Sequence, residues 1–124
     1  MHDFKKLNIW KRGVDLVTEI YQITSQYPES EKFGLINQIR RCSVSVPSNI
    51  AEGSGRKSDK EFRQFLSIAM GSLCELETQL VISKNLNFIN SEQKEVITSE
   101  IHEIQKMIRV FGESLESKSL NTNI

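Results

Sequence analysis

The spacing of apolar residues is the feature that most constrains the fold of this chain. In four stretches these residues recur every three or four positions, which places them on one face of a helix that turns every 3.6 residues. No stretch alternates apolar and polar residues between turn signals, so the sequence predicts an all-α fold without a β-sheet. The four stripes are Leu7, Trp10, Val14, Val17 and Tyr21; Leu35, Ile39, Cys42, Val46 and Ile50; Phe62, Phe65, Ala69, Leu73, Leu76 and Leu80; and Ile97, Ile101, Ile104, Ile108, Phe111 and Leu115.

Helix-ending and helix-starting residues separate these stripes. Pro28 ends the first helix, because the residue before a proline avoids the helical region. Gly53 and Gly55 end the second, because glycine adopts the left-handed cap conformation at little cost. Ser58, followed three residues later by Glu61, predicts a capping box at the start of the third helix.

The remaining helix signals complete the predicted architecture. Ser91 is the expected cap of the fourth helix, and Pro47 should kink the second because it removes a backbone hydrogen bond. Four amphipathic helices with short connections predict an antiparallel, up-down-up-down four-helix bundle. We expect one such domain over residues 1–124, with a frayed tail at about residues 116–124.

Charge is balanced overall but uneven along the chain. The sequence has 16 Lys and Arg against 16 Asp and Glu, which does not suggest a protein that coats nucleic acid in general. Residues 1–57 hold nine basic and six acidic residues, so they carry +3 and residues 58–124 carry −3. Such asymmetry can produce a basic face opposite an acidic one.

Both cysteines, Cys42 and Cys74, lie along apolar stripes, so we expect two small buried side chains in a reducing compartment. A disulfide between them, which would need facing positions on neighbouring helices, is the open alternative. No apolar run approaches the roughly 20 residues of a membrane span. The first residues contain no apolar signal segment. We therefore expect a cytoplasmic protein with no membrane association.

The sequence indicates neither an enzyme nor a metal or cofactor site. Di-iron bundles need Glu-x-x-His pairs, but Ser99 stands three residues before His102, and the other histidine is His2. The run from Gly53 to Ser58 lacks the Gly-Lys-Ser order of a phosphate loop and follows a helix rather than a strand.

Six basic residues around the junction of the second and third helices are the candidate functional residues. Guanidinium and ammonium groups suit phosphate contact, and the start of a helix also favours anions. The open alternatives for the arginine pair are solvation, or pairing with Glu75 or Glu77 across the bundle. The six candidates for nucleic-acid binding are Arg40, Arg41, Arg56, Lys57, Lys60 and Arg63.

Three long segments carry a resemblance to a known family. They are LNIWKRGVDLVTEIY, FGLINQIRRCSVSVPSNIAEGSGR and FRQFLSIAMGSLCELETQLVISKNLNFI. The chain resembles the four-helix-bundle proteins encoded within intervening sequences of bacterial 23S ribosomal RNA genes, the S23-type ribosomal protein family. This resemblance implies a bundle that assembles into a ring, often a pentamer, and similarity to the nucleic-acid-binding accessory protein of diversity-generating retroelements. The word "ribosomal" reflects gene location more than a place in the ribosome.

The residues and the resemblance together lead to two hypotheses. The first is a non-enzymatic homo-oligomer that binds nucleic acid, RNA in preference to DNA, through backbone phosphates. The second is a protein-interaction scaffold, for example for a polymerase or reverse transcriptase. In the second hypothesis Arg40, Arg41 and the loop from Gly53 to Gly55 would contact other subunits or the partner protein.

Overall fold

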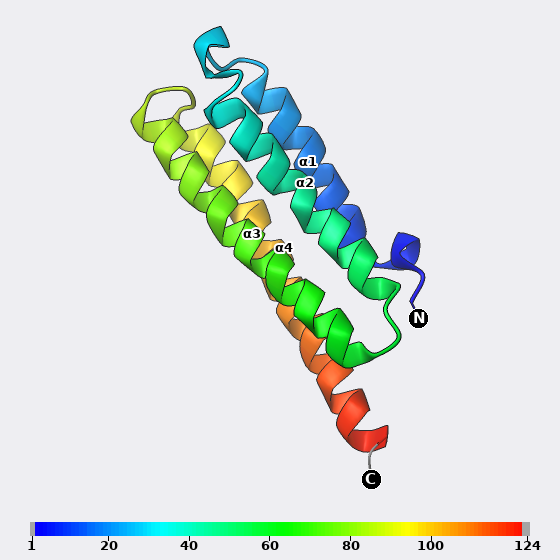
Figure 1. Cartoon of the computed structure of the whole chain (residues 1–124). Coiled ribbons are helices and arrows are strands. Elements are labelled where there is room, and N and C mark those ends of the chain that lie inside the picture. Colours follow the sequence, from blue (N-terminus) through cyan, green and yellow to red (C-terminus); the bar gives the residue numbers. More distant parts are fainter. Residues whose placement is uncertain (1, 123–124) are drawn as a thin grey trace.

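The protein is a bundle of four long helices (Figure 1). The computed structural model describes the backbone of residues 2–122 and the side chains of residues 2–117. The α-helices are α1 (Asn8–Thr24), α2 (Leu35–Ser54), α3 (Asp59–Asn85) and α4 (Ser91–Thr122), with short 3-10 helices η1 (Phe4–Lys6) and η2 (Glu29–Glu31). No strand occurs in residues 2–122, so the all-α, four-helix prediction is confirmed.

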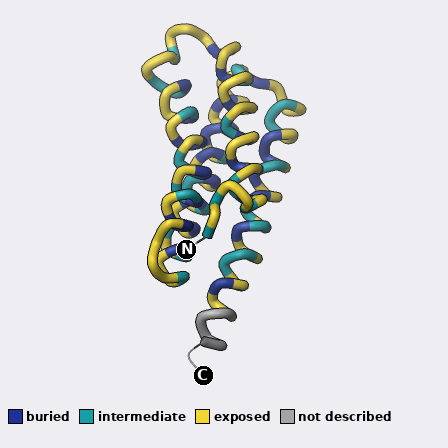
Figure 2. The backbone as a smooth tube through the Cα atoms, turned by 90° about the vertical axis from the view of Figure 1, so that its right-hand side faces the viewer, coloured by how far each residue is buried: buried dark blue, intermediate teal, exposed yellow. Residues whose placement is uncertain are grey.

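Consecutive helices lie side by side and connect at alternating ends of the molecule (Figure 1). The α2–α3 contact is the most extensive, and the α1–α4 contact is the least. Buried positions recur along the inner sides of the helices, and exposed positions dominate the connections (Figure 2). The core therefore runs along the length of the bundle.

Three of the four predicted stripes are buried as the spacing indicated. On α2, α3 and α4 nearly every predicted residue is in the core; Leu35 and Phe111 are half-buried against it, and Phe65 is half-buried. Burial of each large aliphatic or aromatic side chain contributes about 1.5–3 kcal/mol, so these stripes supply most of the driving force for folding.

The predicted stripe of α1 is wrong by about one position. The buried residues of α1 are Ile9, Gly13, Leu16, Ile20 and Thr24, whereas Val14 and Tyr21 are 37% and 43% exposed. The reason is a close approach between helices, since a Cβ atom added at Gly13 would lie 3.3 Å from the Cβ of Pro47. Gly13 and Thr24 have no large apolar side chain, so the large apolar residues of this segment marked the neighbouring face instead.

Pro47 is buried within α2, whose helical assignment continues without interruption to Ser54. The kink expected at Pro47 stays a prediction. Gly53 is inside the helix and Gly55 has φ −88°, so neither adopts the left-handed conformation that the sequence predicted. Gly53 instead allows close packing, because a Cβ atom there would come within 2.7 Å of Phe65 Cβ.

The cap of α4 is Asn90 rather than the predicted Ser91. Asn90 Oδ1 accepts a hydrogen bond from the Gln93 backbone amide at 2.8 Å, and Gln93 Oε1 accepts one from the Asn90 amide at 2.9 Å. This reciprocal pair is a capping box one position earlier than expected. The helix continues to Thr122; fraying of residues 116–124 stays a prediction, and residues 123 and 124 lie outside the described residues.

Of the two cysteines, Cys42 is buried as predicted, but Cys74 is exposed. Cys74 follows the core residue Leu73, and one step along a helix turns the side chain by about 100°, here toward solvent. Both thiols are free, so the disulfide alternative is excluded.

Within the described residues, α3 is long and apolar enough to cross a membrane when judged by length and composition alone. The core helix of a bundle meets the same criterion, and the apolar stripe of α3 packs in the core against α2 and α4. This feature is therefore weak evidence for a membrane span, and the absence of membrane association stays a prediction.

Candidate nucleic-acid interface

The structure divides the six candidate residues between two places. Arg40 and Arg41 lie in the second turn of α2, whereas Arg56, Lys57, Lys60 and Arg63 lie at and after the α2–α3 connection. From Arg41 to the end of α2 at Ser54 the helix rises about 20 Å. The six residues therefore do not form one compact cluster.

Arg40 is held by the end of α1. Its Nε donates a hydrogen bond to Thr24 Oγ1 at 2.9 Å, and its guanidinium carbon lies 4.5 Å from the centre of the Tyr21 ring. Its Nη2 also donates to the Tyr21 carbonyl at 3.4 Å. A cation near the carbonyl end of a helix is stabilising, which gives Arg40 a structural role between α1 and α2. Neither Glu75 nor Glu77 pairs with it among the described ion pairs.

Arg41 faces the other way, toward α3. It lines a groove of about 470 Å³ together with Ser45, Ser72, Glu75 and other polar residues. Ser45 Oγ donates to Ser72 Oγ at 2.6 Å, and the Cys42 thiol donates to the Ser72 carbonyl at 3.1 Å. Burial, with a smaller effect of Glu75, raises the pKa of Cys42 to about 12. The thiol therefore stays protonated at neutral pH and is a poor nucleophile.

The α2–α3 connection presents Arg56, Lys57 and Lys60. Arg56 Nη2 pairs with Glu52 Oε1 at 2.9 Å, and its guanidinium lies 4.6 Å from the Phe65 ring centre. Lys57 and Lys60 are exposed, and neither has a carboxylate within ion-pair distance among the described side chains. These two ammonium groups are therefore open to solvent and to an anionic ligand.

One of the two hydrogen bonds of the capping box predicted at the start of α3 is present. Ser58 is the N-cap residue, and its Oγ accepts a hydrogen bond from the Glu61 amide at 3.1 Å. This bond satisfies one of the free amides at the helix start, the turn that holds Lys60.

Arg63 differs from the other candidates because part of its guanidinium is buried without a partner. Its Nη1 has no hydrogen-bond acceptor in the described part of the chain. Arg63 lines a groove of about 380 Å³ between α3 and α4, where Arg109 is a second guanidinium and Glu113 and Glu116 are carboxylates. Sequence analysis missed Arg109, since nothing near it in the chain shows that the fold brings α4 to this position.

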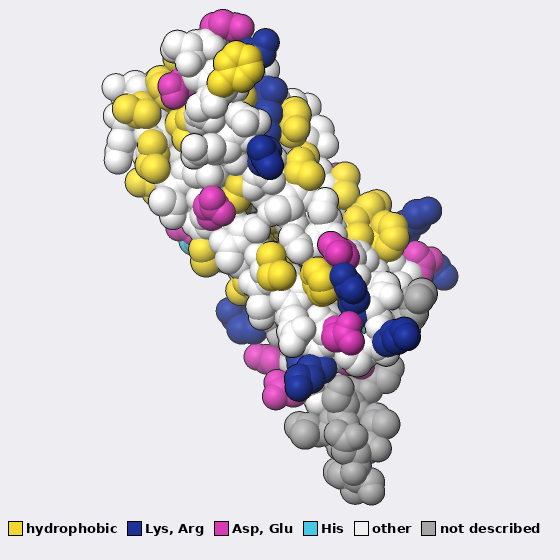
Figure 3. Space-filling view, in the orientation of Figure 1, with side chains coloured by type: hydrophobic (Ala, Val, Ile, Leu, Met, Phe, Trp, Pro, Cys, Tyr) yellow, Lys and Arg dark blue, Asp and Glu magenta, His cyan; other side chains and the backbone are white. Residues whose placement is uncertain are grey.

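Acidic residues lie among these basic ones. Glu52, Asp59 and Glu61 flank the α2–α3 connection, and Asp59 also contacts His2 Nε2 at 3.5 Å. Figure 3 shows Lys and Arg along much of one face of the molecule, with Asp and Glu between them. The interface is thus a set of separate basic positions rather than a continuous basic surface.

Among the described residues, no group of three or more His, Cys, Asp or Glu side chains could hold a metal ion. His102 is exposed, and its Nε2 lies 2.8 Å from Glu77 Oε1. Glu77 therefore has a histidine as its partner rather than an arginine of the pair Arg40 and Arg41.

The fold and these surfaces define a small, helical-bundle protein whose exposed features are charged grooves and basic positions. The chain belongs to the 23S rRNA-intervening sequence protein family, whose family model matches residues 5–110. The predicted family is confirmed. The relation to the accessory protein of diversity-generating retroelements stays a prediction.

A solved structure supports the same assignment. A protein with unknown function from the S23 ribosomal protein family of Bacteroides thetaiotaomicron VPI-5482 has a similar structure, with a TM-score of 0.74 and 25% sequence identity. The match covers 83% of this chain and 96% of that chain. No curated protein matches the chain.

Proposed function

We propose that this protein is a non-enzymatic homo-oligomer that binds nucleic acid, RNA in preference to DNA, through backbone phosphates. The observation that carries the proposal is the buried Nη1 of Arg63, which has no acceptor in the described part of the chain. A buried donor without a partner costs about 1–3 kcal/mol, and a movement of the Arg63 side chain that brought Nη1 to a phosphate oxygen at the groove would remove that cost.

The positions near Arg63 support phosphate contact. Lys57 and Lys60 are exposed without carboxylate partners among the described residues, and Arg56 keeps part of its guanidinium accessible beside Phe65. Arg41 is a separate exposed position farther along α2. Arg40 is the weakest of the six candidates because Thr24 and Tyr21 already accept hydrogen bonds from its Nε and Nη2 and hold the side chain between α1 and α2.

Repetition around an oligomer would strengthen binding. Few basic positions per subunit bind an RNA weakly, but several subunits on one RNA gain from effective concentration. The mixed charge of each subunit, seen in Figure 3, makes this contribution more important than it would be for a strongly basic protein. Phosphate contact without an aromatic platform for stacking gives little base readout.

The test is fluorescence anisotropy of a labelled, structured RNA at several salt concentrations. We expect affinity to fall steeply with salt, because each phosphate contact releases counterions. The double variant Lys57→Gln, Lys60→Gln should weaken binding to unrelated RNAs similarly and reduce the salt slope by about 1 for each lysine. An affinity that hardly changes with salt would contradict the proposal.

A matched control is Lys84→Gln, which removes one exposed lysine from the last turn of α3, at the opposite end of that helix. It should leave RNA binding nearly unchanged. A DNA of the same sequence, used as competitor, measures the expected preference for RNA. If the double variant bound RNA normally but lost oligomerisation, the basic positions would be assembly contacts and the scaffold hypothesis would replace this one.

A further inference from the structure

The contact between α1 and α4 is open on both sides of one central ion pair. Arg12 Nε and Nη2 donate to the two carboxylate oxygens of Glu100 at 2.7 Å and 2.9 Å. On one side a groove of about 550 Å³ lies near η1, and its charged lining has both signs, Lys6 and Lys106 with Glu103. On the other side a groove of about 450 Å³ lies between the second half of α1 and the start of α4. We call this second one the α1–α4 groove.

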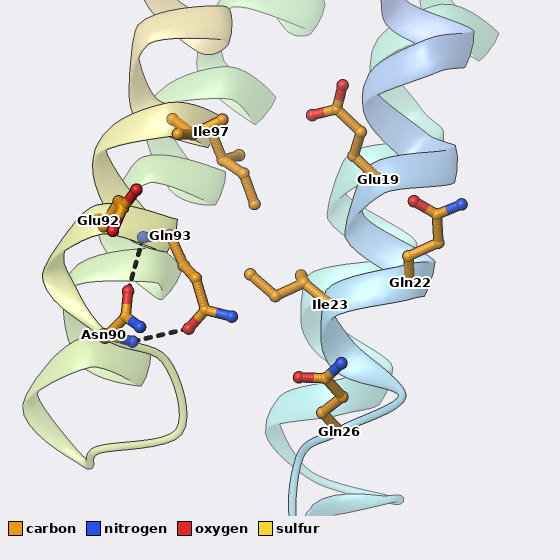
Figure 4. Close-up of a pocket in the computed structure, with 9 residues that line it drawn as sticks. Glu19, Gln22, Ile23, Gln26, Asn90, Glu92, Gln93 and Ile97 are labelled. Carbon is orange, nitrogen blue, oxygen red and sulfur yellow. Dashed lines mark hydrogen bonds between the residues drawn. The ribbon is translucent and has the colours of Figure 1, made fainter.

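The α1–α4 groove has an apolar floor and a polar rim. Ile23 and Ile97 point toward each other across it (Figure 4), and Val96, 62% exposed, lies beside them. Amides surround this floor, with Gln22 and Gln26 on α1. Ile97 is buried and Ile23 is half-buried, so Val96 and the accessible part of Ile23 are the surface on which an added apolar side chain could pack.

The charged residues of the α1–α4 groove are all acidic. Glu19 lines it from α1 and Glu92 from α4, with no lysine or arginine in the lining. Desolvation raises the pKa of Glu19, and the nearby carboxylates Glu100 and Asp15 raise it further, whereas Arg12 opposes them. A partly desolvated carboxylate among other carboxylates gains from an added cation and repels phosphate.

We propose that the α1–α4 groove is a docking site for a positively charged amphipathic helix of another protein. The acidic rim selects lysine and arginine, and the exposed Val96 with the half-buried Ile23 selects a leucine-like residue between them. The groove extends along α1 from Glu19 to Gln26, a rise of about 10 Å, which matches two turns of a docked helix. The site is separate from the basic positions at the α2–α3 connection and would let one subunit hold RNA and a protein at once.

The test uses two synthetic peptides and the full-length protein. The first is an amphipathic helix of leucine and lysine, and the second has the same leucines with glutamate in place of lysine. Titration into ¹⁵N-labelled protein, followed by amide chemical shifts, should show binding of the lysine peptide alone. The shifts should centre on Ile23, Val96 and their neighbours, and the affinity should fall as salt rises.

The variant Glu19→Gln, Glu92→Gln should weaken binding of the lysine peptide about tenfold, since two partly exposed ion pairs are lost. Val96→Asn should weaken it through the apolar floor without disturbing the core, because Val96 is exposed. The matched control is Glu113→Gln, Glu116→Gln, the same charge change in the α3–α4 groove, which should have no effect on the peptide.

Three results would overturn the proposal: equal binding of both peptides, shifts centred elsewhere, or an unchanged affinity in Glu19→Gln, Glu92→Gln. A change in oligomer size in that variant, with no peptide binding to the wild type, would instead make the groove a contact between copies of this chain. The same variant should bind the labelled RNA with wild-type affinity. The peptide test and the RNA test can therefore contradict their proposals separately.

Discussion

Single residues in this bundle act mainly through the space that they leave or fill. Gly53 and Gly71 are both helical glycines, but a Cβ atom at Gly53 would meet Phe65 Cβ at 2.7 Å and Phe62 Cδ1 at 2.8 Å, whereas one at Gly71 would meet nothing within 4 Å. The sequence predicted Gly53 as a helix-ending residue and gave no sign that its lack of a side chain allows close packing against α3. The opposite environments of the two glycines come from packing between elements, which the local pattern does not contain.

The two glycines predict opposite effects of alanine. Gly53→Ala should destabilise the protein by about 1–3 kcal/mol, because Phe65 Cβ, next to the backbone, and a ring carbon of the buried Phe62 must both move. Gly71→Ala should stabilise it by about 0.5–1 kcal/mol, because alanine lowers the entropy of the unfolded chain and favours helix. Urea unfolding followed by circular dichroism measures both, and a change of the same sign in the two variants would contradict the packing argument.

At the scale of the helices, periodicity predicted α2, α3 and α4 well because each has a stripe of large side chains. It failed on α1, where Gly13 rather than a large residue contacts α2, and two neighbouring faces were both plausible from apolar content. The α4 cap was misplaced by one residue because Asn90 and Ser91 are both good N-cap types. Only the hydrogen bonds of Asn90 with Gln93 distinguish them.

The ion pair between α1 and α4 predicts a measurable difference between arginine and lysine. Arg12→Lys should lower the free energy of unfolding by about 0.5–1 kcal/mol, because lysine cannot make both hydrogen bonds to Glu100 and the pair is partly screened by solvent. The matched control is Arg56→Lys at the α2–α3 connection, where Arg56 pairs with Glu52 in a more exposed position. It should change the free energy of unfolding by less than about 0.5 kcal/mol. Urea unfolding at low and high salt checks this, and equal losses in both variants would refute it.

At the scale of the whole molecule, the candidate site was predicted less well than the fold. The sequence predicted the basic residues and the start of α3. It did not predict that Arg41 lies far from Lys57 or that Arg109 lines the same groove as Arg63, because both depend on how the helices are arranged. The acidic α1–α4 groove could not be read at all, because it joins the second half of α1 to the start of α4. Patterns in a single sequence do not show which residues far apart in the chain lie side by side in the fold.

The proposed oligomer gives a prediction for the intact assembly. One chain has a mass of 14.2 kDa, so a pentamer would have five times this mass, about 71 kDa, by light scattering after size-exclusion chromatography. The exposed Ile68 and Ile82 on α3, with Leu86 directly after it, are the kind of apolar surface that such contacts cover. A mass of one chain at every concentration tested would contradict the proposed assembly and remove the avidity on which RNA binding relies.

The small contact between α1 and α4 also bears on the order in which the helices pack during folding. Contacts such as those between α2 and α3 form between neighbours in the chain, whereas Arg12 and Glu100 are separated by 88 positions. Closing a long loop costs more entropy than closing a short one, so such contacts form late. We therefore expect α1 and α4 to be the last helices to meet during folding, and the groove between them to be the last part of the native structure to form.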